Sequence, residues 1–167
     1  GGTLSRSLQS ISSVVPSGRT MPILLNFLME VENEELKITA SDLETTITVK
    51  LNPSMLEQDQ VNKIAIPAKM FLEVVNSLSS QQITVEVKEN YSIEITAGTG
   101  RYKLVGEDPA SYPTAIELSD PALTTISSSV EVKAIGKTLF ATGTGEMRPQ
   151  MTGVLCEQTH NETSFVA

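Results

Sequence analysis

Two stretches of this chain carry the same pattern, PILLNFLMEVENEELKITA over residues 22–40 and PQMTGVLCEQTHNETSFVA over residues 149–167. They align without a gap at a constant offset of 127 residues, and each is typical of a strand, a polar turn and a second strand. Residue classes agree at matched positions, among them Phe27 with Val154, Leu28 with Leu155, and Ile38 with Phe165. The offset has the length of a domain rather than of a solenoid repeat. We therefore expect one complete domain over residues 1–120 and the first part of a second copy over residues 121–167, where the chain is cut.

The composition is that of a globular protein with a packed core, since 40% of the 167 residues are hydrophobic and 19% are charged. Aromatic residues make up only 4% and tryptophan is absent, so Leu, Ile, Val and Met must build the core. This scarcity disfavours sequence-specific recognition of single strands, which relies on stacking of bases on aromatic rings.

The single cysteine, Cys156, cannot form an internal disulfide, which favours a reducing compartment. The sequence shows no charged-then-apolar leader and no run of 18 apolar residues. Both observations predict a cytoplasmic protein that does not interact with membranes.

Periodicity predicts two helices and seven strands in the first domain. Apolar residues recur at helical spacing over residues 3–15, and again over residues 68–78 after Pro67. Strands are expected at residues 23–32, 36–41, 45–51, 64–66, 83–88, 91–96 and 101–105. Residues 109–129 contain a proline-rich linker, and a second-domain helix follows over residues 133–142. The order of elements indicates an α+β fold with two helices packed on antiparallel sheets, repeated from domain to domain.

Charge is distributed unevenly over these elements. The chain holds 12 basic and 20 acidic residues, but the expected helices carry Arg6, Lys69, Lys133 and Lys137 against a single acid, Glu73. If the helices share one side of the sheets, that side is mildly positive and the opposite side strongly negative, which suits a polyanion held on one surface. Alternatively, a few lysines simply solubilise the helices, since four cations are few beside the six to ten phosphate contacts of a tight DNA binder.

Several short strings resemble a known family. RTMPIL (19–24), LKITASDLE (36–44), IPAK (66–69) and DPASYP (108–113) are similar, in order and spacing, to the first domain of the bacterial DNA polymerase III beta subunit, the sliding clamp. EMRPQMTGVL (146–155) resembles the start of that family's middle domain. The resemblance spans essentially all 167 residues.

This resemblance implies three similar domains per subunit in the DNA clamp fold, the third being absent from this chain. Two subunits close head to tail into a ring, a homodimer that encircles double-stranded DNA with its helices lining the hole. It further implies a processivity factor for DNA replication in the cytoplasm, without an active site or a cofactor. The expected partners are the catalytic subunit of DNA polymerase III, the clamp loader, and other replication and repair proteins with a clamp-binding motif.

The resemblance also assigns residues to the DNA-facing surface. Arg6 and Lys69 in the first domain and Lys133 and Lys137 in the second are expected to face the duplex. The family has a DNA-contacting basic residue in the loop before the string that starts near Thr20; Arg19 lies one position out of that register. The alternative for Arg19 is an ordinary solvated loop residue.

Two further surfaces follow from the resemblance. The strand with Arg101, Tyr102, Lys103 and Leu104 corresponds to the edge that meets the third domain of the other subunit, or else is an ordinary edge strand with two core residues. Arg148 and Met151 fall on the first wall of an apolar pocket for partner peptides, although Met151 also fits a strand core. Pro149 and Gln150 replace aromatic residues that are common there in the family, so the peptide preference is expected to differ.

An enzyme is the main alternative class, but catalytic and metal sites are hard to assemble from this sequence. His160 is the only histidine, and no His, Cys and Asp spacing resembles a zinc site. Asp42 and Glu44 could form a carboxylate pair or a cation site, but solvation of a turn and a strand end is the better explanation. Gly143-Thr144-Gly145 lacks the ending of a phosphate-binding loop. A protein-interaction module that does not encircle DNA remains the second alternative.

Overall fold

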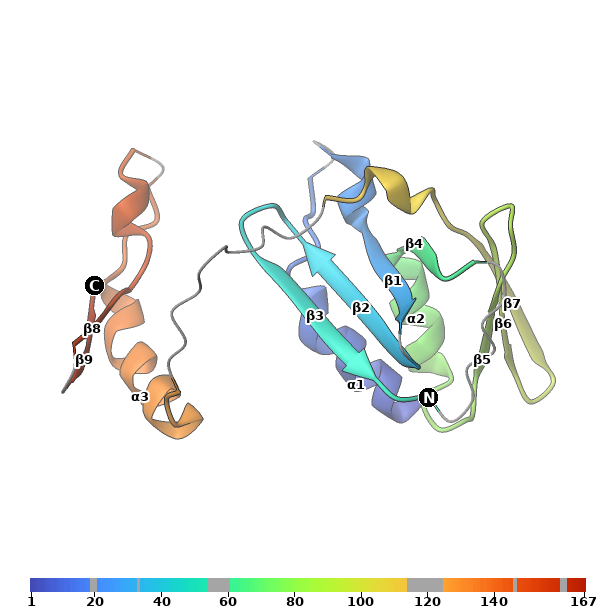
Figure 1. The fold of residues 1–167 in the computed structure, drawn as a ribbon, viewed down its shortest axis with the longest axis horizontal. Helices are drawn as coiled ribbons and strands as arrows, with labels where there is room; N and C mark the ends of the chain where they lie inside the picture. Colours follow the sequence, from blue (N-terminus) through green and yellow to red (C-terminus); the bar gives the residue numbers. More distant parts are fainter. Residues whose placement is uncertain (19–20, 33, 54–60, 114–124, 146, 160–161) are drawn as a thin grey trace. The chain divides into compact units, whose positions relative to one another are not determined.

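A computed structural model of the chain describes residues 1–18, 21–32, 34–53, 61–113, 125–145, 147–159 and 162–167. The chain divides into two compact units, Gly1–Ile116 and Glu117–Ala167, which we call unit 1 and unit 2. Figure 1 shows unit 1 in blue to yellow and unit 2 in orange to red.

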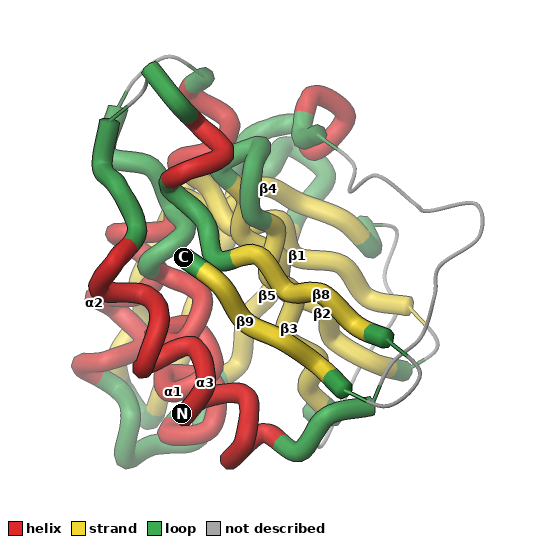
Figure 2. Tube along the Cα trace, turned by 90° about the vertical axis from the view of Figure 1, so that its left-hand side faces the viewer, coloured by secondary structure: helices red, strands yellow, loops and turns green. Residues whose placement is uncertain are grey.

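Unit 1 contains two antiparallel sheets and two helices. The four-stranded sheet has the order β3-β2-β1-β4, with strands β1 (Asn26–Glu32), β2 (Glu35–Ser41), β3 (Thr46–Leu51) and β4 (Lys63–Pro67). The three-stranded sheet has the order β5-β6-β7, with strands β5 (Thr84–Val87), β6 (Ser92–Ala97) and β7 (Gly100–Val105). Helices α1 (Gly2–Ser12) and α2 (Ala68–Ser77) lie together on one side of the strands, as Figure 2 shows. The α+β architecture expected from the sequence is confirmed.

The main core of unit 1 lies between the helices and the sheets. Leu8 and Ile11 of α1 and Phe71 and Val75 of α2 are fully buried, at the positions that helical spacing predicts. Burial of such side chains stabilises the fold by about 1.5–3 kcal/mol each. In β3 the side chains alternate, since Ile47, Val49 and Leu51 pack against the core while Thr46, Thr48 and Lys50 are exposed. At β3 one face of the sheet is therefore buried and the other meets solvent.

A short bridge joins the two sheets. Glu107, just after β7, pairs with Ala65 of β4, its N–H donating to the Ala65 carbonyl at 2.8 Å and its carbonyl accepting from the Ala65 N–H at 3.2 Å. The N–H of Gly106 points the other way and donates to the Tyr91 carbonyl at 2.8 Å. Only glycine fits at position 106, because a Cβ there would lie 2.7 Å from Cδ1 of Ile64.

A second, smaller apolar cluster covers the opposite face of the four-stranded sheet. We call it the outer cluster, and its members are Ile23, Leu24, Leu28, Ala65 and Tyr112. Two 3₁₀ turns bring its residues together, η1 (Pro22–Leu25) before β1 and η2 (Pro109–Ser111) before Tyr112. In Figure 1 these are the blue and yellow turns at the top of unit 1.

The outer cluster differs from two expectations. Residues 22–25 form a 3₁₀ turn rather than the start of a strand, because Pro22 lacks an N–H and the Asn26 side chain donates to the Ile23 carbonyl at 3.1 Å. Residues 109–113, expected in a linker, instead pack on the sheet through Tyr112, which is 5% exposed. The remaining linker residues from 114 to 124 lie outside the described residues.

Unit 2 contains α3 (Ser128–Thr138), the 3₁₀ turns η3 (Leu139–Ala141) and η4 (Pro149–Met151), and the hairpin of β8 (Leu155–Gln158) and β9 (Thr163–Val166). Helix α3 begins five residues before its predicted start at residue 133 and ends at Thr138. Its first turn carries Glu131, whose charge favours a helix N-terminus, so the expectation of an acid-free second-domain helix is wrong.

The sequence repeat is also a repeat of structure. In unit 1, Leu28 pairs with Thr39 and Met29 with Ile38; in unit 2, Leu155 pairs with Val166 and Cys156 with Phe165. Each of these residues is displaced by 127 positions from its counterpart, so the two hairpins share one register. Turns η1 and η4 precede the hairpins at the same offset. Two segments with little sequence identity therefore form the same turn and hairpin.

Candidate nucleic-acid interface and partner surfaces

The two helices of unit 1 are held side by side by a polar contact. The hydroxyl of Ser5 donates to Oδ1 of Asn76 at 2.6 Å, and Nε2 of Gln9 donates to the same oxygen at 3.2 Å. Gly1 lies against the carbonyl of Leu78, so the start of α1 meets the end of α2 and the helices run antiparallel. This packing fixes which side chains the helix layer presents to solvent.

Arg6 and Lys69 are exposed on this layer. Nε of Arg6 donates to the Gly2 carbonyl one turn earlier, at 3.4 Å. Because the helices are antiparallel, Arg6 lies toward the end of α2 while Lys69 lies at its start, so the two cations are spread along the pair. Glu73, also exposed, is the only acid on these two helices.

Lys133 and Lys137 are exposed on α3 and lie four residues apart, on one side of the helix. Lys133 also stands 127 positions after Arg6, so the repeat carries one basic position from α1 to α3. Glu131 is two residues from Lys133, which places it on a different side of the helix. Arg19 lies outside the described residues.

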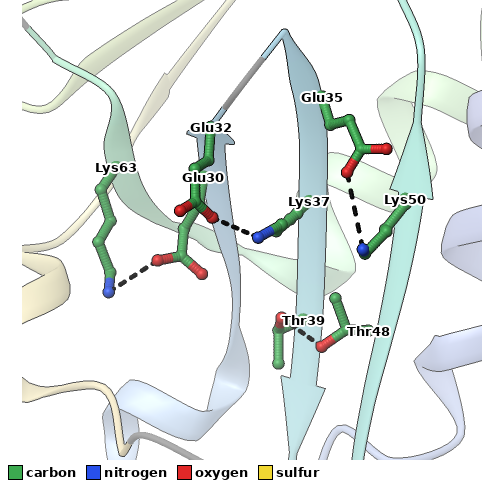
Figure 3. Close-up of polar contacts among 8 residues, drawn as sticks. All are labelled: Glu30, Glu32, Glu35, Lys37, Thr39, Thr48, Lys50 and Lys63. Carbon is green, nitrogen blue, oxygen red and sulfur yellow. Dashed lines mark hydrogen bonds and ion pairs between the residues drawn. The ribbon is translucent and has the colours of Figure 1, made fainter.

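The acids on the four-stranded sheet are paired with lysines, as Figure 3 shows. Nζ of Lys63 lies 2.8 Å from Oε1 of Glu30, and Nζ of Lys50 lies 3.6 Å from Oε2 of Glu35. Lys37 binds Glu32 directly; this hydrogen bond lowers the pKa of Glu32 and raises the pKa of Lys37. The strand register places Lys63 directly opposite Glu30, whereas Lys37 stands opposite Glu30 and reaches Glu32 diagonally.

The three-stranded sheet repeats this arrangement around Glu94. Its Oε1 lies 2.8 Å from Nε of Arg101, and its Oε2 lies 3.6 Å from Nζ of Lys88, which also approaches Glu86 at 3.8 Å. The acids on these strands are therefore largely paired with neighbouring cations, whereas exposed acids of the connecting loops, such as Glu34, Glu44 and Glu89, take part in no ion pair in the described residues.

The remaining cations form a distinct set. Among the described residues, the basic side chains that take part in no ion pair are Arg6, Lys69, Lys103, Lys133, Lys137 and Arg148. All six are exposed. Four of them are on helices, and all six are residues that the sequence associates with DNA or with a partner surface. Among the described residues, the cations of the helices are thus unpaired, and the strand cations other than Lys103 are paired.

Strand β7 is the edge of the three-stranded sheet. Gly106 directs its N–H toward β6 and Glu107 directs its own toward β4, so the alternation along the strand turns the backbone groups of Arg101 and Lys103 away from β6. Tyr102 is 37% exposed, but Leu104 is 5% exposed and belongs to the main core. The side chain of Leu104 is therefore not available to a partner, and it anchors the strand instead.

Two exposed apolar residues near this edge were missed by sequence reasoning. Met70 of α2 is 53% exposed and Val105 of β7 is 74% exposed, and α2 contacts β7. Helical spacing alone could have flagged Met70, because it falls between the buried positions of α2. Val105 lies on the same face of β7 as the charged Arg101 and Lys103, so the sequence pattern indicates a polar, solvent-facing side and gives no sign of an exposed apolar residue there.

In unit 2, Arg148 directly precedes turn η4 and Met151 ends it. Met151 is 56% exposed and Leu155, at the start of β8, is 60% exposed. Arg148 and Met151 are tied together by a hydrogen bond from the Met151 N–H to the Arg148 carbonyl at 2.9 Å. A cation and apolar side chains thus stand next to one another on this unit.

The residues considered for catalysis have other roles or lie outside the described residues. Oδ1 of Asp42 accepts from the N–H groups of Glu44 at 3.0 Å and Thr45 at 2.6 Å, so it closes the turn between β2 and β3. Cys156 is a free, exposed thiol, and His160 is outside the described residues. No cluster of His, Cys, Asp or Glu suited to a metal ion occurs in the described parts of the chain. None of the described helices has the length and hydropathy that a membrane crossing requires.

Residues 2–119 match the family model for the DNA polymerase III beta subunit, N-terminal domain. The chain belongs to this family. Its members are the beta subunit of the polymerase, a processivity subunit without catalytic activity. The expectation that the chain is not an enzyme agrees with this membership.

Individual members of the beta-subunit family support the assignment. The chain is 29% identical over 140 residues to the beta sliding clamp of Staphylococcus aureus and 28% identical to that of Staphylococcus epidermidis, matches that cover 81% of this chain. Among solved structures, the polymerase III beta chain of Streptococcus pneumoniae superimposes with a TM-score of 0.85 at 25% identity over 96% of this chain. The beta subunit of Pseudomonas aeruginosa gives a TM-score of 0.84 at 27% identity over 94%.

The chain is shorter than these proteins. It spans 37% of the length of the two Staphylococcus clamps, 44% of the Streptococcus structure and 42% of the Pseudomonas structure. The clamp fold is thus shared over part of a clamp chain.

Proposed function

We propose that this chain is the N-terminal domain (residues 1–120) and the first part of the middle domain (residues 121–167) of a sliding clamp. Together with the rest of the middle domain and a third domain it forms a homodimeric ring around duplex DNA in the cytoplasm. The ring is placed by a clamp loader and tethers the catalytic subunit of DNA polymerase III and other proteins with a clamp-binding motif.

One observation carries the DNA-facing assignment. All strand cations except Lys103 are paired with acids, whereas Arg6, Lys69, Lys133 and Lys137 are exposed on helices without an ion-pair partner in the described residues. Unpaired cations are free to approach phosphates without breaking an existing contact. Arg19, outside the described residues, stays a prediction for the same surface.

The small number of these cations suits a clamp. A protein that fixes many phosphates loses mobility along the duplex, while a few exposed lysines and arginines attract the backbone through the solvent. Enclosure of the duplex then supplies retention, and the cations supply orientation. The sheets need not repel DNA strongly, because most of their cations are already paired with acids and are not available to phosphates.

Exposed groups also mark the two surfaces proposed for protein partners, the edge strand β7 and the region of Arg148 and Met151. Strand β7 offers the backbone groups of Arg101 and Lys103 to a strand of the other subunit, with Tyr102 partly exposed beside them and Leu104 holding the strand to its own core. Met70 and Val105 add apolar area near this edge. Arg148 and Met151 form one wall of the pocket for partner peptides, and the chain alone is expected to bind such peptides poorly.

The test uses the complete gene product. Its mass in solution is measured by light scattering, and its retention on nicked circular DNA, after loading by a clamp loader, is compared before and after linearisation. A dimer that stays on circles and runs off linear ends supports the proposal. A monomer, or binding that is indifferent to DNA ends, would favour the alternative, an interaction module that does not encircle DNA.

A further inference from the structure

A hollow of about 380 Å³ lies in unit 1 where the start of β4, the turn between β5 and β6, and turn η2 meet. Val61 and Lys63 come from the first of these segments, Glu89 and Tyr91 from the second, and Asp108 and Pro109 from the third. The volume is near the lower end of the range for ligand pockets, about 300–1,000 Å³, so the hollow suits one side chain better than a large ligand. It is separate from the DNA-facing, dimer and peptide surfaces proposed above.

The charged groups around this hollow are not equally compensated. Nζ of Lys63 lies 2.8 Å from Oε1 of Glu30, a carboxylate that does not line the hollow, as Figure 3 shows. Glu89 and Asp108 are exposed and take part in no ion pair within the described residues. The same holds for Glu107, next to Asp108. The described residues thus leave the hollow with a net negative charge that would attract a cation.

Backbone contacts hold two of the lining side chains in place. Oδ1 of Asp108 accepts from the Ala110 N–H at 2.9 Å, which orients the carboxylate and leaves Oδ2 for a further donor. Tyr91 has a φ of 60°, a left-handed conformation that is uncommon for an aromatic residue. Its N–H donates to the Lys88 carbonyl at 2.9 Å, and its carbonyl accepts from the Gly106 N–H at 2.8 Å. A carboxylate and an aromatic residue are therefore preorganised beside one hollow.

We propose that this hollow binds the side chain of an arginine presented by a partner protein. A guanidinium group has five N–H donors in one plane, enough for the carboxylates of both Glu89 and Asp108, and it stacks on aromatic rings such as that of Tyr91. Val61 and Pro109, both half-buried, offer apolar surface to the methylene stem. Free arginine fits less well, because its own α-carboxylate would approach these acids, whereas an arginine within a peptide chain carries none.

The test observes Tyr91 directly in the complete gene product, labelled with 3-fluorotyrosine. The fluorine NMR signal of Tyr91 is assigned with the Tyr91→Phe variant. The probe is the capped peptide acetyl-glycyl-arginyl-glycine amide at low salt, and its neutral counterpart carries citrulline in place of arginine. We expect a saturable shift of the Tyr91 signal with a dissociation constant on the order of 1 mM, because a single side chain makes few contacts. The citrulline peptide should bind about tenfold more weakly, since it has the same shape without the charge.

Isosteric variants test the two carboxylates. Glu89→Gln and Asp108→Asn are each expected to weaken binding of the arginine peptide about three- to tenfold. The fold should tolerate both, because Glu89 is exposed on a turn and the amide of Asp108→Asn keeps an oxygen for the Ala110 N–H. Glu44→Gln is the matched control, since it removes the same charge from an exposed acid that does not line the hollow, and it should leave the affinity unchanged.

The proposal is overturned if the Tyr91 signal does not shift, if the citrulline peptide shifts it equally, or if Glu44→Gln weakens binding as much as the two variants of the hollow. Equal affinity for acetyl-glycyl-lysyl-glycine amide would overturn the choice of arginine. Equal affinity for free arginine would overturn the docking of a protein segment. None of these outcomes depends on DNA or on ring formation, so they are separate from the test of the clamp function.

Discussion

The Ser5 hydroxyl lies 2.6 Å from Oδ1 of Asn76, and this hydrogen bond ties α1 to α2. The two partners are not equivalent, because Ser5 is 6% exposed whereas Asn76 is exposed and also accepts from Gln9. A buried group that loses its partner is destabilising, while an exposed group that loses one can bind water instead. Removal of the Asn76 side chain is therefore expected to destabilise the fold more than removal of the Ser5 hydroxyl.

Asn76→Ala is expected to lower the free energy of unfolding by about 1–3 kcal/mol, since it leaves the Ser5 hydroxyl buried without this acceptor. Ser5→Ala is expected to cost less, about 0.5–1.5 kcal/mol, and the double variant less than the sum of both. Urea unfolding followed by circular dichroism measures all three. Equal costs for the two single variants would show that the Ser5 hydroxyl finds another acceptor.

Gly106→Ala tests the close approach between the two sheets. A Cβ at position 106 would lie 2.7 Å from Cδ1 of Ile64 and 2.8 Å from the Ala65 carbonyl oxygen. Because a backbone atom is involved, the strands must separate, and we expect a loss of about 1–3 kcal/mol in the free energy of unfolding. Gly153→Ala is the control, since nothing lies within 4 Å of its Cβ position. Equal stability of both variants would contradict the tight packing at Gly106.

Much of the fold could be predicted because its helices and strands produce repeating patterns of apolar residues over short stretches of sequence. The helical spacing of Leu8 and Ile11 and the alternation of Ile47 and Val49 each repeat within a few residues, so one sequence suffices to read them. The turn and hairpin repeat could be found for the same reason, since two segments of one chain carry one pattern. The ring is a prediction that rests on the family resemblance alone, because no local pattern indicates it.

The features that could not be predicted depend on contacts between distant residues. The pairing of Glu30 with Lys63 requires the register of β1 and β4, so counting acids on strands could not show that these acids are paired with cations. Tyr112 stands among prolines and serines, a composition typical of a linker, and only the tertiary fold buries its ring. The alternation of apolar and polar residues along a strand does not show whether Leu104 packs into its own domain or against a partner.

Charge reversal on the helices should weaken the electrostatic attraction of the clamp to DNA. In the complete gene product, Arg6→Glu and Lys69→Glu are each expected to slow loading onto circular DNA by about threefold, since one screened surface contact is worth about 0.5–1 kcal/mol. Lys50→Glu on β3 is the matched control, because Lys50 is exposed but paired with Glu35 on the sheet. Loading rates are measured by fluorescence of labelled clamps at several salt concentrations. A similar loss in the control would point to a general effect of net charge.

Lys103→Glu should weaken the dimer of the complete gene product. Lys103 is exposed on the edge strand and has no ion pair in the described residues, so its reversal leaves the fold of unit 1 intact. We expect the dissociation constant to rise about three- to tenfold in analytical ultracentrifugation. Leu104→Ala is unsuitable for this purpose, because it opens the core of unit 1. An unchanged dimer with Lys103→Glu would remove this residue from the interface.

Alkaline pH should destabilise unit 1 through Tyr112. Burial raises the pKa of Tyr112 to about 12, against an opposing backbone hydrogen bond from Ser41, whereas the unfolded chain has the ordinary value of 10.0. Between these values the folded state keeps a proton that the unfolded state has released, so stability is unaffected below about pH 10 and falls as the pH rises toward about 12. The slope from this one group is at most about 1.4 kcal/mol per pH unit. Urea unfolding at several pH values measures it, and Tyr112→Phe removes it while keeping the contribution of the lysines that titrate in the same range. Identical slopes for both proteins would mean that the Tyr112 hydroxyl is solvated in the folded state.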